Sequence, residues 1–230
     1  NITIRRAVLK ALDPFDYLDS LWQSQGFVSL GMPVVQNDWL LPRDVLRGQY
    51  FADPEMARDM LEEAGVKRPI SFDLIVGDFG DIYIEHGRRI QQDLKSVGFE
   101  PFLTVVNPSQ YTDMVWRDKS YQFSIGALPP TSTTNSFLFA ILHAEFGRWN
   151  VVNHSDSILD TIIQDQAVER DPTSRGALIR GLQEYILDQA YMFSPATSGT
   201  RWVFSPDVSG FYPNTPASEY FFWAKTWLDK

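Results

Sequence analysis

Three extended segments separated by two helical ones limit most strongly how this chain can fold. The apolar pattern predicts strands at Ile70–Val76, Phe102–Val106 and Tyr121–Leu128. Apolar residues spaced by three and four predict a helix over Tyr83–Val97, and a second helical stretch covers Pro108–Lys119. This β-α-β-α-β order favours an α/β layer in which crossover helices join parallel strands.

Further helices are expected on both sides of this layer. Each begins at a residue type that caps helices, or at an aspartate followed by proline. From Ser194 onward, prolines and aromatics indicate short strands and turns, whereas Gly26–Pro42 reads as an irregular connection. The expected helices are Arg5–Leu12, Asp53–Gly65 and Ser136–His143, with two more beginning at Asp156 and at Asp171.

The composition excludes several classes of protein. The chain has no cysteine, so disulfides, thiol nucleophiles and cysteine-bound metals are impossible within it. Its 29 acidic residues outnumber 20 basic ones, and a net charge of −9 makes nucleic acid a poor partner. No apolar run approaches the roughly 20 residues of a membrane span, and the first residues show no signal-peptide core. We therefore expect either a cytosolic protein or a mature or truncated product.

Local strings that resemble catalytic motifs lack their necessary context. Asp78–Gly80 matches a kinase magnesium triplet without the other kinase motifs, and His143–Glu145 matches a zinc-deaminase string whose partner needs cysteine. The three histidines, His86, His143 and His154, are not spaced as metal ligands. We expect no catalytic residue, metal or cofactor. A hydrolase that uses two carboxylates stays open as the alternative, because the required separation is spatial.

Five strings, in one order, resemble the C-terminal half of family 5 extracellular solute-binding proteins. These are the peptide, dipeptide and nickel receptors of ABC importers. The first string, IRRAVLKALD, is similar to the family's V-R-R-A-I-x-x-A-I-D, and the second, DPEMARDMLEEAG, to D-P-E-K-A-K-x-L-L-x-E-A-G. The strings are Ile4–Asp13, Asp53–Gly65, Ile90–Phe99, Trp149–Asp160 and the segment that begins at Asp171-Pro172.

The resemblance implies a fold and a domain organisation. The fold would be a periplasmic-binding-protein-like α/β lobe, type II and similar to cluster C, with a mixed sheet flanked by helices. Residues 1–204 would form the C-terminal lobe, and residues 205–230 a tail that returns to the N-terminal lobe in full-length relatives. Because the first string lies near the middle of family members, the chain looks like a fragment, or like one lobe chosen for expression.

The resemblance also implies a function. The chain would belong to the ligand-binding component of an ABC importer, exported to the periplasm or cell surface, with a lipid-anchored precursor as one option. Its partners would be a small-molecule or peptide ligand, the permease subunits of the transporter and the missing N-terminal lobe. Neither nucleic acid nor catalysis is expected.

Family members that bind peptides place an aspartate after the strand corresponding to Tyr121–Leu128, where it meets the ligand ammonium. Here Pro130 occupies that position and no acidic residue lies nearby. Polar uncharged side chains follow instead, and these suit neutral polar or anionic ligands. The alternative interpretation is a helix-capping loop without ligand contacts. The candidate ligand residues of this segment are Leu128, Thr131, Ser132, Thr133, Thr134 and Asn135.

A second candidate group is Arg148, Trp149 and Asn150. Trp149 could stack on a ligand while Arg148 clamps a carboxylate. The alternative is a rim arginine over a packed tryptophan. Tyr212 is a further candidate, because it precedes the returning tail and would close the floor of the cleft.

Overall fold

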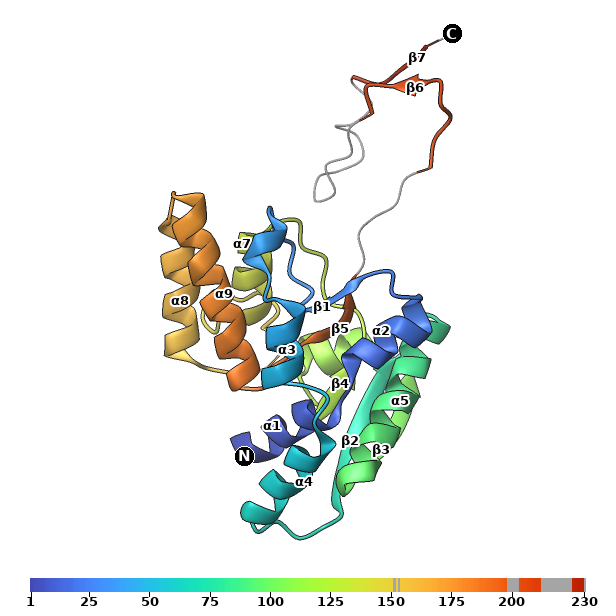
Figure 1. The fold of residues 1–230 in the computed structure, drawn as a ribbon, viewed down its shortest axis with the longest axis vertical. Coiled ribbons are helices and arrows are strands. Elements are labelled where there is room, and N and C mark those ends of the chain that lie inside the picture. The colour runs from blue at the N-terminus through green and yellow to red at the C-terminus, as the bar shows by residue number, and fades with distance from the viewer. Residues whose placement is uncertain (151, 153, 198–202, 212–224, 230) are drawn as a thin grey trace.

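The computed structural model describes residues 1–150, 152, 154–197, 203–211 and 225–229 (Figure 1). The α-helices are α1 (Ile2–Ala11), α2 (Pro14–Trp22), α3 (Arg43–Gln49), α4 (Pro54–Glu63), α5 (Asp81–Val97), α6 (Pro108–Tyr111), α7 (Thr134–Phe137), α8 (Ser157–Val168) and α9 (Pro172–Asp188). Three shorter helical segments are the 3-10 helix η1 (Asn37–Trp39) and the π-helical η2 (Thr112–Arg117) and η3 (Leu138–Leu142). The strands are β1 (Phe27–Ser29), β2 (Ile70–Gly77), β3 (Phe99–Val106), β4 (Phe123–Ile125), β5 (Ser194–Thr197), β6 (Val208–Ser209) and β7 (Trp227–Leu228).

Strands β3, β2 and β4 form a parallel sheet in that spatial order. β2 pairs with β3 along its whole length, whereas β4 contributes three residues, the first of which, Phe123, lies opposite Leu74. The sheet and its crossover helices confirm the predicted α/β class. Antiparallel pairing, within the described ranges, is confined to β1 with β5 and β6 with β7.

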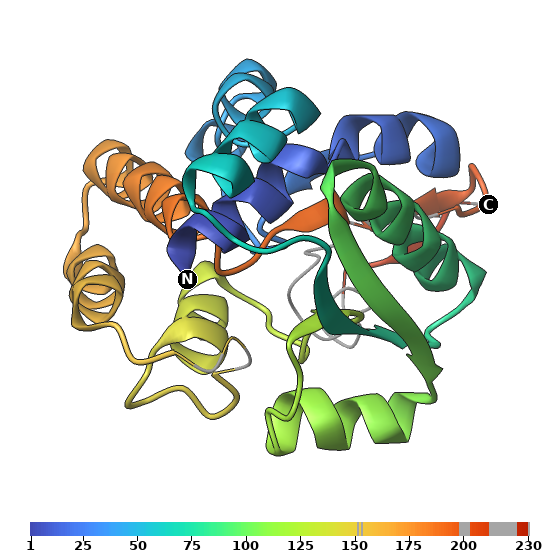
Figure 2. The ribbon, with the colours of Figure 1, turned by 90° about the horizontal axis from the view of Figure 1, so that it is seen from below.

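Alternation along β2 places apolar side chains on both faces of the sheet. Leu74 and Val76 pack with Leu94 of α5 on one face, while Ile75 packs with Val115 of η2 on the other. Figure 2 shows α5 on one side of the sheet and the α6–η2 segment on the opposite side. Burying each such side chain stabilises the fold by about 1.5–3 kcal/mol.

A second hydrophobic core lies among the helices that follow and precede the sheet in sequence. η1, α7, α8 and α9 contribute fully or almost fully buried residues, among them Trp39, Phe137, Leu159 and Ile179. α8 and α9 pack against each other, and β1 joins the same core through Val28. The described residues therefore form one core among the helices and one around the sheet, the latter with a separate cluster on each face.

The predicted helix boundaries agree with the structure where the sequence contains a recognisable capping residue. Asp53, Asp156 and Asp171 each accept hydrogen bonds from backbone N–H groups of the helix that follows. Gly98 ends α5 with a φ of 108°, a conformation that only glycine adopts without strain. These signals are local, so tertiary packing did not override them.

Two helices and one strand were not predicted. α2 begins at Asp13-Pro14, and Asp13 accepts hydrogen bonds from two backbone N–H groups, so its signal was present in the sequence. α3 follows Pro42 without a side-chain cap, and β1 and η1 interrupt the predicted irregular connection. β4 is shorter than the predicted Tyr121–Leu128 strand, because only three residues pair with β2.

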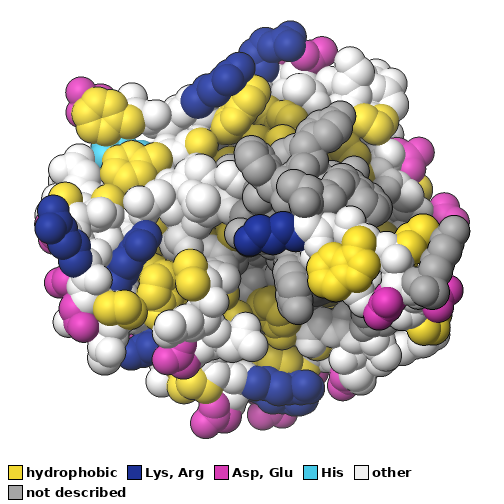
Figure 3. Space-filling model, turned by 90° about the horizontal axis from the view of Figure 1, so that it is seen from above, with side chains coloured by type: hydrophobic (Ala, Val, Ile, Leu, Met, Phe, Trp, Pro, Cys, Tyr) yellow, Lys and Arg dark blue, Asp and Glu magenta, His cyan; other side chains and the backbone are white. Residues whose placement is uncertain are grey.

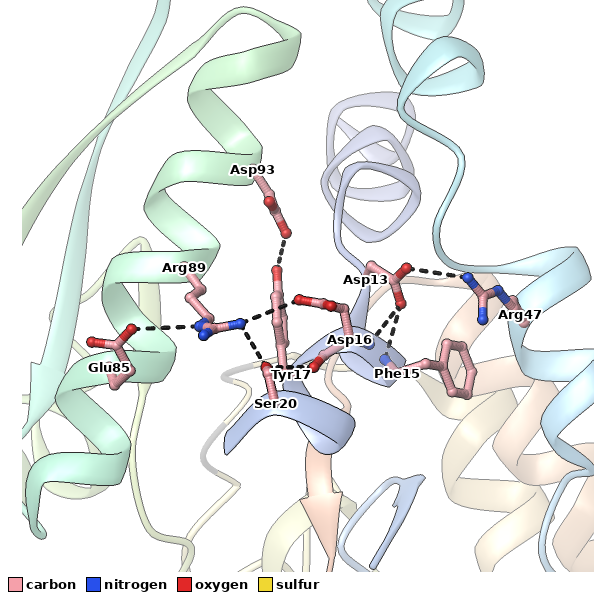
Figure 4. A network of polar contacts seen from close by, with 9 residues as sticks. All are labelled: Asp13, Phe15, Asp16, Tyr17, Ser20, Arg47, Glu85, Arg89 and Asp93. Atoms are coloured by element: carbon pink, nitrogen blue, oxygen red, sulfur yellow. Dashed lines mark hydrogen bonds and ion pairs between the residues drawn. The ribbon is translucent and has the colours of Figure 1, made fainter. Parts of the chain in front are cut away.

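Polar contacts bind α2 to α5, as Figure 4 shows. The Tyr17 hydroxyl donates to the Asp93 carboxylate, and Arg89 Nη1 donates to Asp16 Oδ2 at 3.2 Å and to Ser20 Oγ at 2.6 Å. Burial, helped by the Asp93 carboxylate, raises the pKa of Tyr17, so its hydroxyl stays protonated and remains a donor.

In the described part of the chain, no helix is long and apolar enough to cross a bilayer.

Candidate functional site

A cavity of about 1010 Å³ runs along the outer edge of β4. Its walls come from α1, α5, β4 and the segment 190–197, which includes β5. It extends from Ile70 and Gln122, at the amino ends of β2 and β4, to Leu128 beyond the carboxyl end of β4. The cavity thus follows the full length of the edge strand.

Aromatic side chains dominate one wall of this cavity. Tyr83, Tyr111 and Tyr121 line it, and Phe79 makes edge contacts with the first two at ring distances of 5.5 and 5.3 Å. Burial raises the pKa of Tyr111 and of Tyr121 to about 12. Both hydroxyls therefore stay neutral under physiological conditions and can act as hydrogen-bond donors.

The α8 side of the cavity carries His154 and Tyr191. Their rings stack at 4.5 Å, and the Tyr191 hydroxyl donates to Asp156 Oδ2 at 2.8 Å. Neither ring nitrogen of His154 has a hydrogen-bond partner, although both are buried. Burial lowers the pKa of His154 and outweighs the opposing effects of Asp156 and Asp160, so the imidazole is held neutral.

The α5 side of the cavity carries His86, which is 5% exposed. Its Nε2 accepts a hydrogen bond from Trp22 Nε1 at 2.9 Å, whereas its Nδ1 is buried without a partner. Burial and the nearby Arg89 guanidinium lower the pKa of His86 to about 4. This wall is therefore uncharged at neutral pH.

The loop after β4 holds six of the predicted ligand residues. It starts at the carboxyl end of the parallel sheet, beside the turns that follow β2 and β3, and this is where open α/β sheets bind ligands. Leu128 lines the cavity and lies near Gly31. The structure therefore brings this loop to a suitable edge of the fold.

Several hydrogen-bonding groups of this loop are engaged within the protein. Thr133 caps α7 in a capping box with Ser136, and Thr134 Oγ1 donates to the Pro33 carbonyl at 2.6 Å. Asn135 Oδ1 accepts from Gln166 Nε2 and Arg175 Nη2, both at 2.9 Å. Among the predicted polar residues of the loop, Ser132 and Thr133 are exposed and Thr131 is half-buried. Contact between any of these residues and a ligand stays a prediction.

The second candidate group lies beside the cavity, behind Trp116. The Trp149 ring is 5.8 Å from that of Trp116, which lines the cavity, and the Arg148 guanidinium lies 4.8 Å from the Trp149 ring. Asn150 is 7% exposed, and its Nδ2 donates to the His154 carbonyl at 2.9 Å, while Oδ1 has no partner. Trp149 packs against the helical core, so its contact with a ligand stays a prediction.

Of the other residues that the sequence analysis singled out, some lie within the described part of the structure and some do not. Tyr212 lies outside the described residues, as does much of the predicted tail. Asp78–Gly80 forms the turn between β2 and α5. His143 Nδ1 accepts hydrogen bonds from the backbone N–H groups of Glu145 and Phe146, so this histidine supports a turn.

The sequence interpretation missed His86, His154 and Tyr191 as cavity residues. They come from separate segments of the chain, and only the tertiary packing brings them to one cavity. The aromatic content of 14% was the one available signal, and it does not indicate which residues line a cavity. In the residues that the structure describes, no group of three or more His, Asp or Glu side chains could hold a metal ion.

Figure 3 shows the molecule from above. On the visible described atoms, apolar side chains lie beside separate Lys, Arg, Asp and Glu side chains, and charges of both signs are interspersed. No broad patch of one sign is visible there.

Comparisons with known proteins find similar structures. No family model matches the sequence, and no curated protein matches it. The oligopeptide-binding protein AppA from Bacillus subtilis, solved with a nonapeptide, has a TM-score of 0.71 and 17% identity and matches 100% of this chain. The dipeptide binding protein from Pseudoalteromonas sp. SM9913, solved with Met-Leu, has a TM-score of 0.74 and 18% identity over 93% of this chain.

A third similar structure binds a different kind of molecule. AgaA from A. tumefaciens R10, solved with agropinic acid, has a TM-score of 0.69 and 14% identity over 99% of the chain. This chain covers 48%, 43% and 47% of AppA, the dipeptide binding protein and AgaA, so it spans slightly less than half their length. The likeness establishes that the chain has the fold of these binding proteins, as the resemblance in the sequence implied.

Proposed function

We propose that this chain is one lobe of the solute-binding receptor of an ABC importer. The observation that carries the proposal is the likeness of 93–100% of the chain to about half of each of three proteins that bind small solutes or peptides. Such receptors hold a ligand between two lobes that close by a hinge motion. Residues 1–204 would supply one wall of the cleft, and residues 205–230 would return to the other lobe.

The ligand would meet this lobe at the carboxyl ends of β2, β3 and β4. There the exposed Ser132 and the half-buried Thr131 offer hydroxyl groups and no carboxylate. A buried ammonium without a carboxylate costs several kcal/mol, roughly, so the free amino end of a peptide would need a partner on the other lobe. Neutral polar or anionic solutes suit this lobe better.

The proposed receptor works by binding and delivery, without chemistry on its ligand. It would act outside the cytoplasm, in the periplasm or at the cell surface, and hand its ligand to the membrane permease subunits. The similar proteins are named as binding proteins, which supports this role over the carboxylate-dependent hydrolase. Whether the precursor carries a lipid anchor is a separate expectation.

Thermal shift of the two-lobed protein with a panel of peptides, opines, sugars and organic acids tests the proposal. We expect at least one class to raise the melting temperature, and calorimetry on that compound to show binding without turnover. Conversion of the compound into a product would overturn the receptor assignment in favour of an enzyme.

A pair of variants places the site. Ser132→Arg puts a long side chain at the carboxyl-end loop and should weaken binding by about tenfold or more. Ser96→Arg makes the same change in the last turn of α5, at the amino end of the sheet, and should leave affinity unchanged. Equal affinities for both variants would move the ligand away from this loop.

A further inference from the structure

A network of hydrogen bonds from α8 and α9 holds one side chain at the start of α7. Arg175 of α9 donates to Gln166 Oε1 of α8 from Nη2 at 3.1 Å and from Nε at 3.3 Å. Its Nη2 also donates to Asn135 Oδ1 at 2.9 Å, and Gln166 Nε2 donates to the same oxygen at 2.9 Å. Three helices therefore meet at the side-chain amide of Asn135.

The neighbours of each amide in this network determine which way it points. A guanidinium has donors only, so Gln166 must turn Oε1 toward Arg175. Gln166 Nε2 then faces Asn135 and the backbone carbonyl of Ile163, which accepts at 2.9 Å. Since Gln166 is fully buried, it has no water to turn to. Both neighbours present donors to Asn135, so this residue must direct Oδ1 inward and Nδ2 outward.

The outward Nδ2 group of Asn135 is available to a ligand. It makes no hydrogen bond within the described residues and is not buried, although the side chain as a whole is half-buried. Asn135 lies in the first turn of α7, directly after the loop that leaves the carboxyl end of β4. At this position the protein therefore offers N–H groups and no acceptor.

Arg175 places a positive charge behind this amide. Its guanidinium lies 5.4 Å from the centre of the Trp39 ring, and the ion pairs of the described residues do not include it. A cation that donates to an amide oxygen strengthens the N–H donors of the same amide, because hydrogen bonds in a chain polarise one another. The charge and the donor both favour a carboxylate as the group bound here.

We propose that Asn135 is a specificity-determining residue, which donates from Nδ2 to a carboxylate of the transported solute, and that Arg175 and Gln166 position it. The inference rests on the proposed function, because it names the chemical group that this lobe binds. A network that only held α7 against α8 and α9 would have no effect on the choice between ligands.

An isosteric change at Asn135 separates the two roles. Asn135→Asp keeps the oxygen that accepts from Arg175 and Gln166 and replaces Nδ2 by a second oxygen. Calorimetry on the two-lobed protein uses succinate, benzoate and N-acetylleucine, each paired with its carboxamide. We expect the wild type to bind at least one carboxylate about tenfold or more tighter than its carboxamide, and Asn135→Asp to lose this preference without a lower melting temperature.

A matched control makes the same amide-to-carboxylate change elsewhere. Gln92 is exposed on α5, and Gln92→Glu should keep the full preference for the carboxylate.

Variants of Arg175 test whether it positions Asn135. Arg175→Met leaves Asn135 in place but removes the donors that orient it, so the preference for the carboxylate should fall severalfold. Arg175→Lys keeps the charge and a donor and should recover part of it. Arg180→Met is the control, because Arg180 also lies on α9 but donates to the Asp38 carbonyl, at 2.6 Å. The ratio of two affinities is unchanged when part of a sample unfolds, so a purely structural role would not alter it.

The possible failures of the two proposals are distinguishable. The inference is overturned, and the receptor assignment left intact, if Asn135→Asp or Arg175→Met binds with an unchanged preference. Binding by the wild type of carboxamides over carboxylates, or only of compounds without a carboxylate, has the same consequence. A protein that binds neither these compounds nor the wider panel contradicts the proposed function, and the inference fails with it.

Discussion

The hydroxyl of Tyr191 donates a 2.8 Å hydrogen bond to Oδ2 of Asp156, the residue that caps α8. Tyr185 donates to the same oxygen at 2.9 Å, while Oδ1 accepts from the backbone N–H groups of Ile158 and Leu159. One carboxylate therefore ties the start of α8 to the end of α9 and to the cavity wall.

Removing this carboxylate should destabilise the protein more than loss of a cap alone. Asp156→Ala removes a cap worth about 1 kcal/mol and two hydrogen bonds worth about 0.5–1.5 kcal/mol each, so we expect a loss of about 2–4 kcal/mol. Asp171→Ala removes a cap at α9 with no tyrosine partner and should cost less than Asp156→Ala. Urea unfolding of both variants measures the difference, and equal losses would contradict a role for the tyrosines.

The same carboxylate has a consequence at low pH. Burial raises the pKa of Asp156, but hydrogen bonds from Tyr191, Leu159, Tyr185 and Ile158 outweigh burial and lower it overall. Its contribution to the free energy of unfolding is complete above the unfolded pKa of about 3.9 and disappears as pH falls through the lower folded value. Asp156→Asn should therefore lose stability at neutral pH and approach the wild type as pH falls through the lowered pKa of the folded state.

His86 should make the protein less stable between pH 6.5 and about 4. In this window the unfolded chain binds a proton at His86 and the folded chain does not, because the folded pKa is about 4. The free energy of unfolding therefore decreases as the pH is lowered through this window, by up to about 1.4 kcal/mol per pH unit. Above pH 6.5 this group has no effect on it. His86→Gln keeps an acceptor for Trp22 and should have a shallower slope in urea titrations; identical slopes would exclude His86.

Two glycines on α9 should respond oppositely to alanine. A methyl group at Gly176 would lie 2.7 Å from the Trp39 indole, so we expect Gly176→Ala to cost about 1–3 kcal/mol. At Gly181 nothing lies within 4 Å, and Gly181→Ala should stabilise the helix by about 0.5–1 kcal/mol. Thermal unfolding measures both, and a stabilising Gly176→Ala would show that Trp39 moves freely.

Thr133 offers a test of ligand charge that leaves the fold intact. Aspartate and asparagine both cap helices well, so Thr133→Asp and Thr133→Asn should each preserve the cap of α7. If this loop faces the ligand, the aspartate should raise affinity for amine-bearing compounds severalfold in calorimetry on the two-lobed protein, and the asparagine should not. No difference between the variants across an amine panel would count against the loop.

Much of the fold was predictable because its signals are local. The pairs Asp53-Pro54 and Asp171-Pro172 indicate where two helices begin, and Gly98 indicates where one ends. The alternation around Ile75 indicates a strand that is buried on both faces. The site was less predictable. Thr133 and Asn135 are polar and adjacent to the right edge of the sheet, yet the structure commits both to internal hydrogen bonds, which sequence spacing does not reveal.

By itself, the sequence determined the α/β class, the order of the main elements and the absence of thiol chemistry, because each follows from residue type or from contacts within one turn or one strand. Only the tertiary structure decided that His86, His154 and Asn1, from three separate segments of the chain, line a single cavity beside β4. Such meetings depend on how elements far apart in the chain pack. Packing energy is distributed over many residues of both cores, so no short string of the sequence records it.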